Sequence, residues 1–154
     1  MCTEPTESKY LESDLAQQTV EEIRLYQIKI KKEKNKLKNL IVKLIRKYDD
    51  FDEKRTLKSV MNDAGVSYNV FSRINYKKDN YSGPDKMGCI RIALAIGCDN
   101  FDDIDSILLA RGFEPLVNAC GDENVYIRDI IEIILSNEEL PPIDRVTIFR
   151  ERVG

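Results

Sequence analysis

Apolar residues recur every three or four positions over most of the chain, which is the spacing of one face of an α-helix. The first such stretch, residues 8–47, is rich in Glu, Lys, Gln, Leu and Ile, most of which favour helices. Its rhythm weakens where Glu33 and Lys34 fall at apolar positions, so we expect one long helix, or two helices joined near residues 33–36. Residues 26–31 alternate like a strand, but the residues on either side favour helix.

The helical spacing continues after this first stretch and is interrupted by glycine and proline. Residues 84–97 are apolar nearly all round, which predicts the central core helix. Pro84 is expected as its first residue, with Ser82 or Gly83 as its cap. These patterns predict an all-α fold. The expected helices beyond residue 36 are 37–48, two short helices within 56–78, and then 84–97, 100–112, 122–135 and 143–150.

The stretch from residue 99 onward is expected to supply three of these helices. Asn100 is suited to cap the first of them, because its side-chain oxygen can accept a hydrogen bond from a backbone amide of the first turn. The last two helices either complete the core or form a surface for a partner. The inner face of the 100–112 helix is expected to hold Ile104, Ile107, Leu108 and Leu109.

The stretch from Thr56 to Lys78 is predicted to form two short helices around a tight turn. Thr56 can cap the first helix because its hydroxyl oxygen can accept a hydrogen bond from a backbone amide, and Ser67 can cap the second. Gly65 lies where the first helix must end, since glycine adopts the left-handed conformation at low cost. The apolar positions around this turn are Leu57, Val60, Met61, Ala64, Val66, Val70, Phe71 and Ile74.

This pattern resembles the helix-turn-helix of the Cro and phage-repressor (XRE-like) family. The residues that carry the resemblance are Val60, Met61, Ala64, the turn glycine Gly65, Val66, Phe71 and Ile74. Residues 90–97 and 101–116 are similar to the fourth and fifth helices of many repressor-like bacterial regulators. The resemblance therefore covers about residues 37–116. It implies a cytoplasmic protein that binds double-stranded DNA sequence-specifically, as a homodimer, and regulates transcription.

The resemblance also implies a set of DNA contacts. In such motifs the second helix enters the major groove, and its first residues meet the base edges. The base-reading positions carried over to this chain are Tyr68, Asn69, Ser72 and Arg73. Asn69 is suited to hold adenine and Arg73 to hold guanine, each through two hydrogen bonds. Contacts to phosphates, which set position rather than sequence, are expected from Thr56, Lys58, Lys77, Lys78, Tyr81 and Lys86.

We expect three segments in the chain: residues 1–36 as a tail and long helix, 37–116 as the DNA-binding domain, and 117–154 as a helical extension. The long helix has no obvious partner in so short a chain. Two copies could bury their apolar stripes together, or the helix could fold back on its own domain. In a two-fold dimer the reading helices would lie roughly 34 Å apart, which matches half-sites one helical turn apart.

The charge is distributed unevenly, although the formal net charge is only −3. Residues 24–47 hold ten Lys or Arg and one acid, Glu33, whereas residues 99–154 hold thirteen acids and five bases. Because the local field matters more than the total, an acidic sum is compatible with a basic side that faces DNA. The acidic last third argues against DNA contact there.

The residue types argue against catalysis. Histidine is absent, which excludes Ser-His-Asp and Cys-His pairs, and neither a glycine-rich phosphate loop nor an HExxH motif occurs. We expect no enzyme activity and no cofactor. The four cysteines lack metal-ligand spacing and are interpreted as reduced and mostly buried, so no metal site is expected. No stretch is apolar enough to span a membrane, and the N-terminus lacks a signal-peptide core.

Two functions from different classes stay open at this point. The first is a repressor-like transcriptional regulator that reads double-stranded DNA. The second is a helical protein-protein interaction module that keeps the fold without reading DNA. The long N-terminal helix and the acidic C-terminal helices are the candidate surfaces for a protein partner. Leu57 favours the second function, because the family often has a phosphate-binding glutamine at that position.

Overall fold

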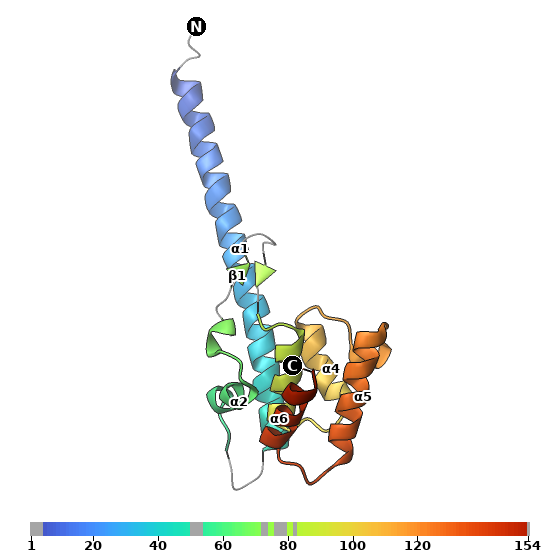
Figure 1. Cartoon of the computed structure of the whole chain (residues 1–154). Helices are drawn as coiled ribbons and strands as arrows, with labels where there is room; N and C mark the ends of the chain where they lie inside the picture. Colours follow the sequence, from blue (N-terminus) through green and yellow to red (C-terminus); the bar gives the residue numbers. More distant parts are fainter. Residues whose placement is uncertain (1–4, 50–53, 72–73, 76–79, 82, 154) are drawn as a thin grey trace.

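The computed structural model of the chain describes residues 5–49, 54–71, 74–75, 80–81 and 83–153. The fold is all-α, as the spacing predicts; among the described residues the strands form a single two-residue antiparallel ladder, in which Ile74 pairs with Tyr81 and Asn75 with Asn80 (Figure 1). The elements in chain order are α1 (Pro5–Tyr48), α2 (Leu57–Ala64), the 3-10 turn η1 (Tyr68–Phe71), β1 (Ile74–Asn75), β2 (Asn80–Tyr81), α3 (Lys86–Ile96), α4 (Phe101–Ala110), the 3-10 turn η2 (Leu116–Asn118), α5 (Asp122–Ser136) and α6 (Pro142–Val153).

α1 is one continuous helix of 44 residues, so neither the predicted joint near 33–36 nor the strand alternative for 26–31 is realised. Charged residues such as those near position 33 are good helix formers, and they interrupt the apolar stripe without interrupting the backbone. The N-terminal half of α1 extends away from the rest of the molecule (Figure 1). It does not fold back: Val20, Ile23, Leu25 and Ile28 are each more than half exposed.

The core is organised around α3, which confirms the prediction of a central helix. α3 contacts α1, α2, α4 and α6. The C-terminal half of α1 covers one side of this core, and α5 and α6 complete it, so residues 122–153 share the core of the preceding helices. The residues of α3 that are buried are Gly88, Cys89, Ile90, Ile92, Ala93, Leu94, Ala95 and Ile96, and those of α1 are Leu37, Ile41, Leu44 and Ile45.

α3 begins later than its sequence predicts. Its first residue is Lys86 rather than Pro84, and its cap is Asp85 rather than Ser82 or Gly83. The Asp85 carboxylate accepts a hydrogen bond of 2.7 Å from the Gly88 amide, and a carboxylate in this position also complements the positive end of the helix dipole.

The capping of α4 by Asn100 is confirmed, because the Asn100 side chain accepts a hydrogen bond from the Asp103 amide at 2.9 Å. Ile104, Ile107 and Leu108 are buried, but Leu109 is 57% exposed, so its predicted place on the inner face is wrong. Successive residues of a helix differ by about 100° in direction. Leu109 therefore points away from the core that Leu108 faces.

The first half of the predicted two-helix motif forms as expected. Thr56 caps α2 in a reciprocal box with Ser59, and Gly65 ends the helix in the left-handed conformation, at φ 67°. The guanidinium of Arg91, on α3, donates a hydrogen bond of 3.0 Å to the Ala64 carbonyl, which satisfies one of the orphan carbonyls at the end of α2.

The predicted second helix is wrong. The chain makes only the four-residue turn η1 and then enters the β1–β2 ladder. Residues 66–78 hold two each of Val, Ser, Tyr and Asn and contain no Ala, Leu, Glu or Gln, so this segment has little intrinsic tendency to propagate a helix. Val70 and Phe71 are buried at 3% and 2% exposure, so the short turn is enough to anchor the segment to the core.

Candidate nucleic-acid interface

A groove of about 490 Å³ lies where the start of α2 meets η1. It is open to solvent, and its walls combine polar and apolar side chains. Four of the residues that line it, Thr56, Lys58, Ser59 and Asn62, come from the first turns of α2 and its cap. The full lining consists of Thr56, Lys58, Ser59, Met61, Asn62, Val66, Ser67 and Tyr68.

The α2 wall of the groove is built by the capping box. The Thr56 hydroxyl oxygen accepts from the Ser59 amide at 3.1 Å, while the Ser59 hydroxyl oxygen accepts from the Thr56 amide at 3.0 Å. A hydroxyl that accepts can still donate its own proton, so this cap leaves the Thr56 O–H available to a ligand. Lys58 follows in the first turn, where its ammonium adds to the positive end of the helix dipole.

The η1 wall is held by aromatic packing. The rings of Tyr68 and Phe71 meet edge to face, with their centroids 5.4 Å apart. Phe71 is buried, whereas Tyr68 is 44% exposed and faces the groove. The ammonium of Lys38, on α1, lies 6.0 Å from the centroid of the Tyr68 ring, a distance at which a cation is attracted to the ring face. The basic side of α1 therefore adjoins η1.

The structure brings together some of the residues assigned by the resemblance. Thr56, Lys58 and Tyr68 line the same groove, and Asn69 follows Tyr68 on η1, where it is exposed. Lys86 stands apart: it begins α3, and its ammonium donates to the side-chain oxygen of Asn124, on α5. Tyr81 belongs to β2, but its side chain lies outside the described part. The predicted residues Ser72, Arg73, Lys77 and Lys78 lie outside the described residues.

Four polar residues of this region were absent from the predicted contacts: Lys38, Ser59, Asn62 and Ser67. Ser67 is recognisable in the sequence as a cap, and Lys38 belongs to the basic run of α1, but neither signal indicates the groove. The amide of Asn69 donates to the Ser67 hydroxyl oxygen at 3.2 Å. Among the described residues that line the groove none carries a carboxylate, and the charged group they contribute is the ammonium of Lys58.

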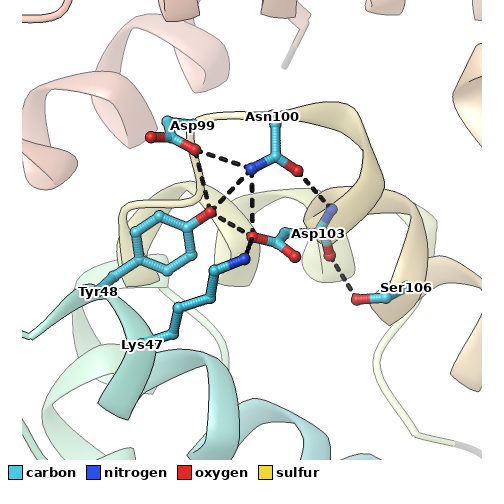
Figure 2. Close-up of polar contacts among 6 residues, drawn as sticks. All are labelled: Lys47, Tyr48, Asp99, Asn100, Asp103 and Ser106. Carbon is cyan, nitrogen blue, oxygen red and sulfur yellow. Dashed lines mark hydrogen bonds and ion pairs between the residues drawn. The ribbon is translucent and has the colours of Figure 1, made fainter.

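A second polar cluster joins the end of α1 to the start of α4 (Figure 2). The Asp103 carboxylate accepts from the Lys47 ammonium at 2.8 Å and also from the Tyr48 hydroxyl and the Asn100 amide. The Tyr48 hydroxyl is also within hydrogen-bond distance of Asp99, at 3.0 Å. These groups provide one another's hydrogen-bond partners although they lie more than 50 residues apart in the sequence. The cluster therefore fixes α1 against α4.

The protonation of this cluster follows from its contacts. Burial alone raises the pKa of the Asp103 carboxyl, but the hydrogen bonds from Lys47, Tyr48 and Asn100 outweigh it, so the pKa lies below its ordinary value. The hydrogen bond to Asp103 raises the pKa of Lys47. Burial, together with the bond to Asp103, raises the pKa of Tyr48. At neutral pH the cluster is therefore a charged Lys47–Asp103 pair bonded to a neutral phenol.

The described cysteines are free thiols. Cys89 and Cys98 are buried, and burial raises the pKa of each thiol to about 12, which leaves them protonated. Cys120 is exposed. In the part of the chain that the structure describes, no three His, Cys, Asp or Glu residues gather as metal ligands would. None of the described helices combines the length and the apolar character needed to cross a bilayer.

Comparison of the chain with models of protein families, with curated proteins and with solved structures found no match in any of the three. The likeness to repressor-like regulators therefore rests on the sequence pattern alone.

Proposed function

We propose that the protein binds double-stranded DNA through the α2–η1 groove and acts as a repressor-like transcriptional regulator. The observation that carries this proposal is that Thr56, Lys58 and Tyr68, three of the residues assigned by the resemblance, line one exposed groove. A surface of this kind suits a phosphate backbone, because it offers hydroxyl and ammonium donors, and none of its described lining residues is a carboxylate that would compete for them.

Base reading in this proposal differs from that of a regular helix-turn-helix. A four-residue turn presents fewer side chains to a DNA groove than a full helix does, so Tyr68 and Asn69 at the rim carry the base contacts on the described side. A good bidentate contact discriminates by about 1–3 kcal/mol. Because Asn69 is the one described residue assigned a bidentate base contact, we expect a modest sequence preference in addition to a strong attraction to the DNA phosphate backbone.

α1 extends the proposed surface. Lys38 lies beside Tyr68, and exposed lysines continue from there towards the N-terminus of the helix as far as Lys29. Each ammonium that neutralises a phosphate releases a counterion, which makes the binding steeply salt-dependent. The exposed lysines of this stretch are Lys29, Lys31, Lys32 and Lys36.

A second candidate function is a helical interaction module, and one observation favours it. The projecting half of α1 exposes Val20, Ile23, Leu25 and Ile28 at 64%, 52%, 66% and 55%. A helix with such an apolar surface gains stability by pairing with another helix, and a second copy of this chain offers the matching one. In this function binding depends on apolar burial and tolerates salt.

The two functions are separated by measuring affinity for a fluorescent DNA duplex over a range of salt concentrations. Lys58→Ala is expected to weaken binding equally for all sequences and to reduce the salt slope by about 1, because one phosphate contact is lost. Asn69→Ala is expected to relax the sequence preference. Arg152→Ala, on α6 and outside the groove, is the control and should leave binding unchanged. No measurable affinity for the duplex, even at low salt, would favour the interaction module.

A further inference from the structure

A second pocket, of about 300 Å³, lies on a different part of the molecule from the α2–η1 groove. It is formed where the end of α1, the segment before α2, the end of α3 and the loop between α5 and α6 meet. Its lining consists of Tyr48, Arg55, Ile96, Gly97, Glu138, Leu140, Pro142 and Arg145. Two of these side chains are guanidinium groups, and their surroundings differ.

Arg55 is fully engaged by the protein. Its Nε donates to Asp49 at 3.0 Å, one terminal nitrogen donates to the Ala95 carbonyl at 2.9 Å, and the other donates to the Ile96 carbonyl. The guanidinium therefore closes the C-terminal end of α3, and its charge is balanced by Asp49 and by the negative end of that helix. Arg55 shapes the pocket but has little left to offer a ligand.

Arg145 is buried at 6% exposure, and its Nε has no hydrogen-bond partner among the described residues. The ion pairs found in the described part of the chain, Lys47–Asp103 and Arg55–Asp49, do not include it. Arginine stays charged in proteins, and a buried charge without a counter-charge is strongly destabilising. The Glu138 carboxylate lines the same pocket, but it is exposed and forms no ion pair with Arg145.

The start of α6 is a further wall that favours a small anion. Arg145 lies in the first turn of α6, where its amide donates to the Pro141 carbonyl, so the pocket also meets the positive end of that helix. Gly97 lines the pocket at φ 103°, a left-handed conformation that favours glycine. Ile96, Leu140 and Pro142 add apolar surface for the body of a ligand.

We propose that this pocket binds a small molecule through an oxyanion, a phosphate or carboxylate group held by Arg145. The guanidinium fork matches either group with two parallel hydrogen bonds. The ligand would contact α1, α3 and α6 together, so it would stabilise the folded state and link three elements of the core. This proposal does not depend on the proposed DNA binding.

The test is a thermal melt of the whole chain titrated with inorganic phosphate, and in parallel with acetate. Wild type is expected to gain about 2–4 °C in Tm once the anion exceeds its dissociation constant about fivefold, and Tm should then keep rising with the logarithm of the anion concentration. The acetate and phosphate arms distinguish carboxylate ligands from phosphate ligands. Arg145→Met should lose this gain in Tm, whereas Arg152→Met, which changes an exposed arginine of the same helix, should keep it.

Two further measurements keep the proposal testable if Arg145→Met fails to fold. The NMR signal of the wild-type Arg145 Nε–H should shift and saturate with phosphate, while that of Arg152 stays in place. Glu138→Gln should bind phosphate more tightly, because a competing carboxylate is removed. An unmoved Arg145 signal, together with a loss of stability in Glu138→Gln, would instead identify Glu138 as the counter-charge and overturn the proposal.

Discussion

α2 and η1 are separated by one turn, and each follows a residue whose hydroxyl oxygen accepts a hydrogen bond from a backbone amide. Nevertheless, α2 is a regular helix, whereas η1 ends after four residues. Thr56 accepts from the amide three residues on, and α2 continues to Gly65. The Ser67 hydroxyl oxygen accepts a hydrogen bond from the amide two residues further on. The Val70 amide donates to the Ser67 carbonyl, which is the hydrogen bond of a 3-10 turn.

The difference teaches that a cap marks where a helix starts and does not determine how far it extends. Propagation needs residues with good helix propensity or a face that gains from burial. α2 buries Val60, Met61 and Ala64 and receives Arg91 at its end. In η1 the two residues that gain from burial, Val70 and Phe71, are already placed within the first turn.

The largest expected effect tests how strongly Phe71 anchors η1 to the core. Phe71→Ala is expected to reduce the free energy of unfolding by about 3–5 kcal/mol, because it removes a buried aromatic side chain and leaves a cavity. Urea denaturation measures this change. Tyr68→Ala is the matched control, expected to cost about 1 kcal/mol or less, since it removes an exposed ring and one aromatic contact. Equal losses for the two variants would contradict the packing described for η1.

The next effect tests the local signal that starts α2. Thr56→Ala is expected to lower the free energy of unfolding by about 0.5–2 kcal/mol, because the Ser59 amide loses its acceptor. Thr56→Ser keeps the acceptor and should restore most of the stability. If Thr56→Ala is neutral, the capping box is not what holds the start of α2.

The smallest expected effect tests a contact that neither cap nor spacing encodes, the Asp103 cluster. Its carboxyl has a folded pKa below the ordinary value of 3.8. The stability it contributes is therefore fully present above pH 3.8 and is lost as the pH falls through the lower, folded pKa. In Asp103→Asn, the free energy of unfolding should fall less as the pH is lowered, because the contribution of the ionised carboxylate is already absent. Urea denaturation from pH 6 downward measures this change. An unchanged pH profile in the variant would contradict the assignment.

The sequence predicted those features that depend on nearby residues. The capping by Thr56 and Asn100, the ends at Gly65 and Gly97, and the central position of residues 84–97 all follow from short-range propensity or from apolar spacing. It failed at residues 67–71, where burial of two side chains within one turn removes the need for a longer helix.

The remaining features depend on contacts between distant residues. Lys47 meets Asp103 across 56 positions, and Arg145 is enclosed with Arg55, which lies 90 positions earlier in the chain. The groove is a comparable case: the family resemblance named Thr56, Lys58 and Tyr68, but the position of Lys38 against Tyr68 follows only from how α1 packs.

The central claim, that the α2–η1 face binds DNA, is tested most directly by selecting bound sequences from a random duplex DNA pool at near-physiological salt. The account predicts enrichment of a short, weakly preferred sequence. If the protein is a two-fold dimer, the sequence should be a palindrome with half-sites about one helical turn apart. Enrichment should fall in Asn69→Ala. Folded protein that enriches no sequence and retains no DNA at low salt would contradict the account and favour the exposed half of α1 as the functional surface.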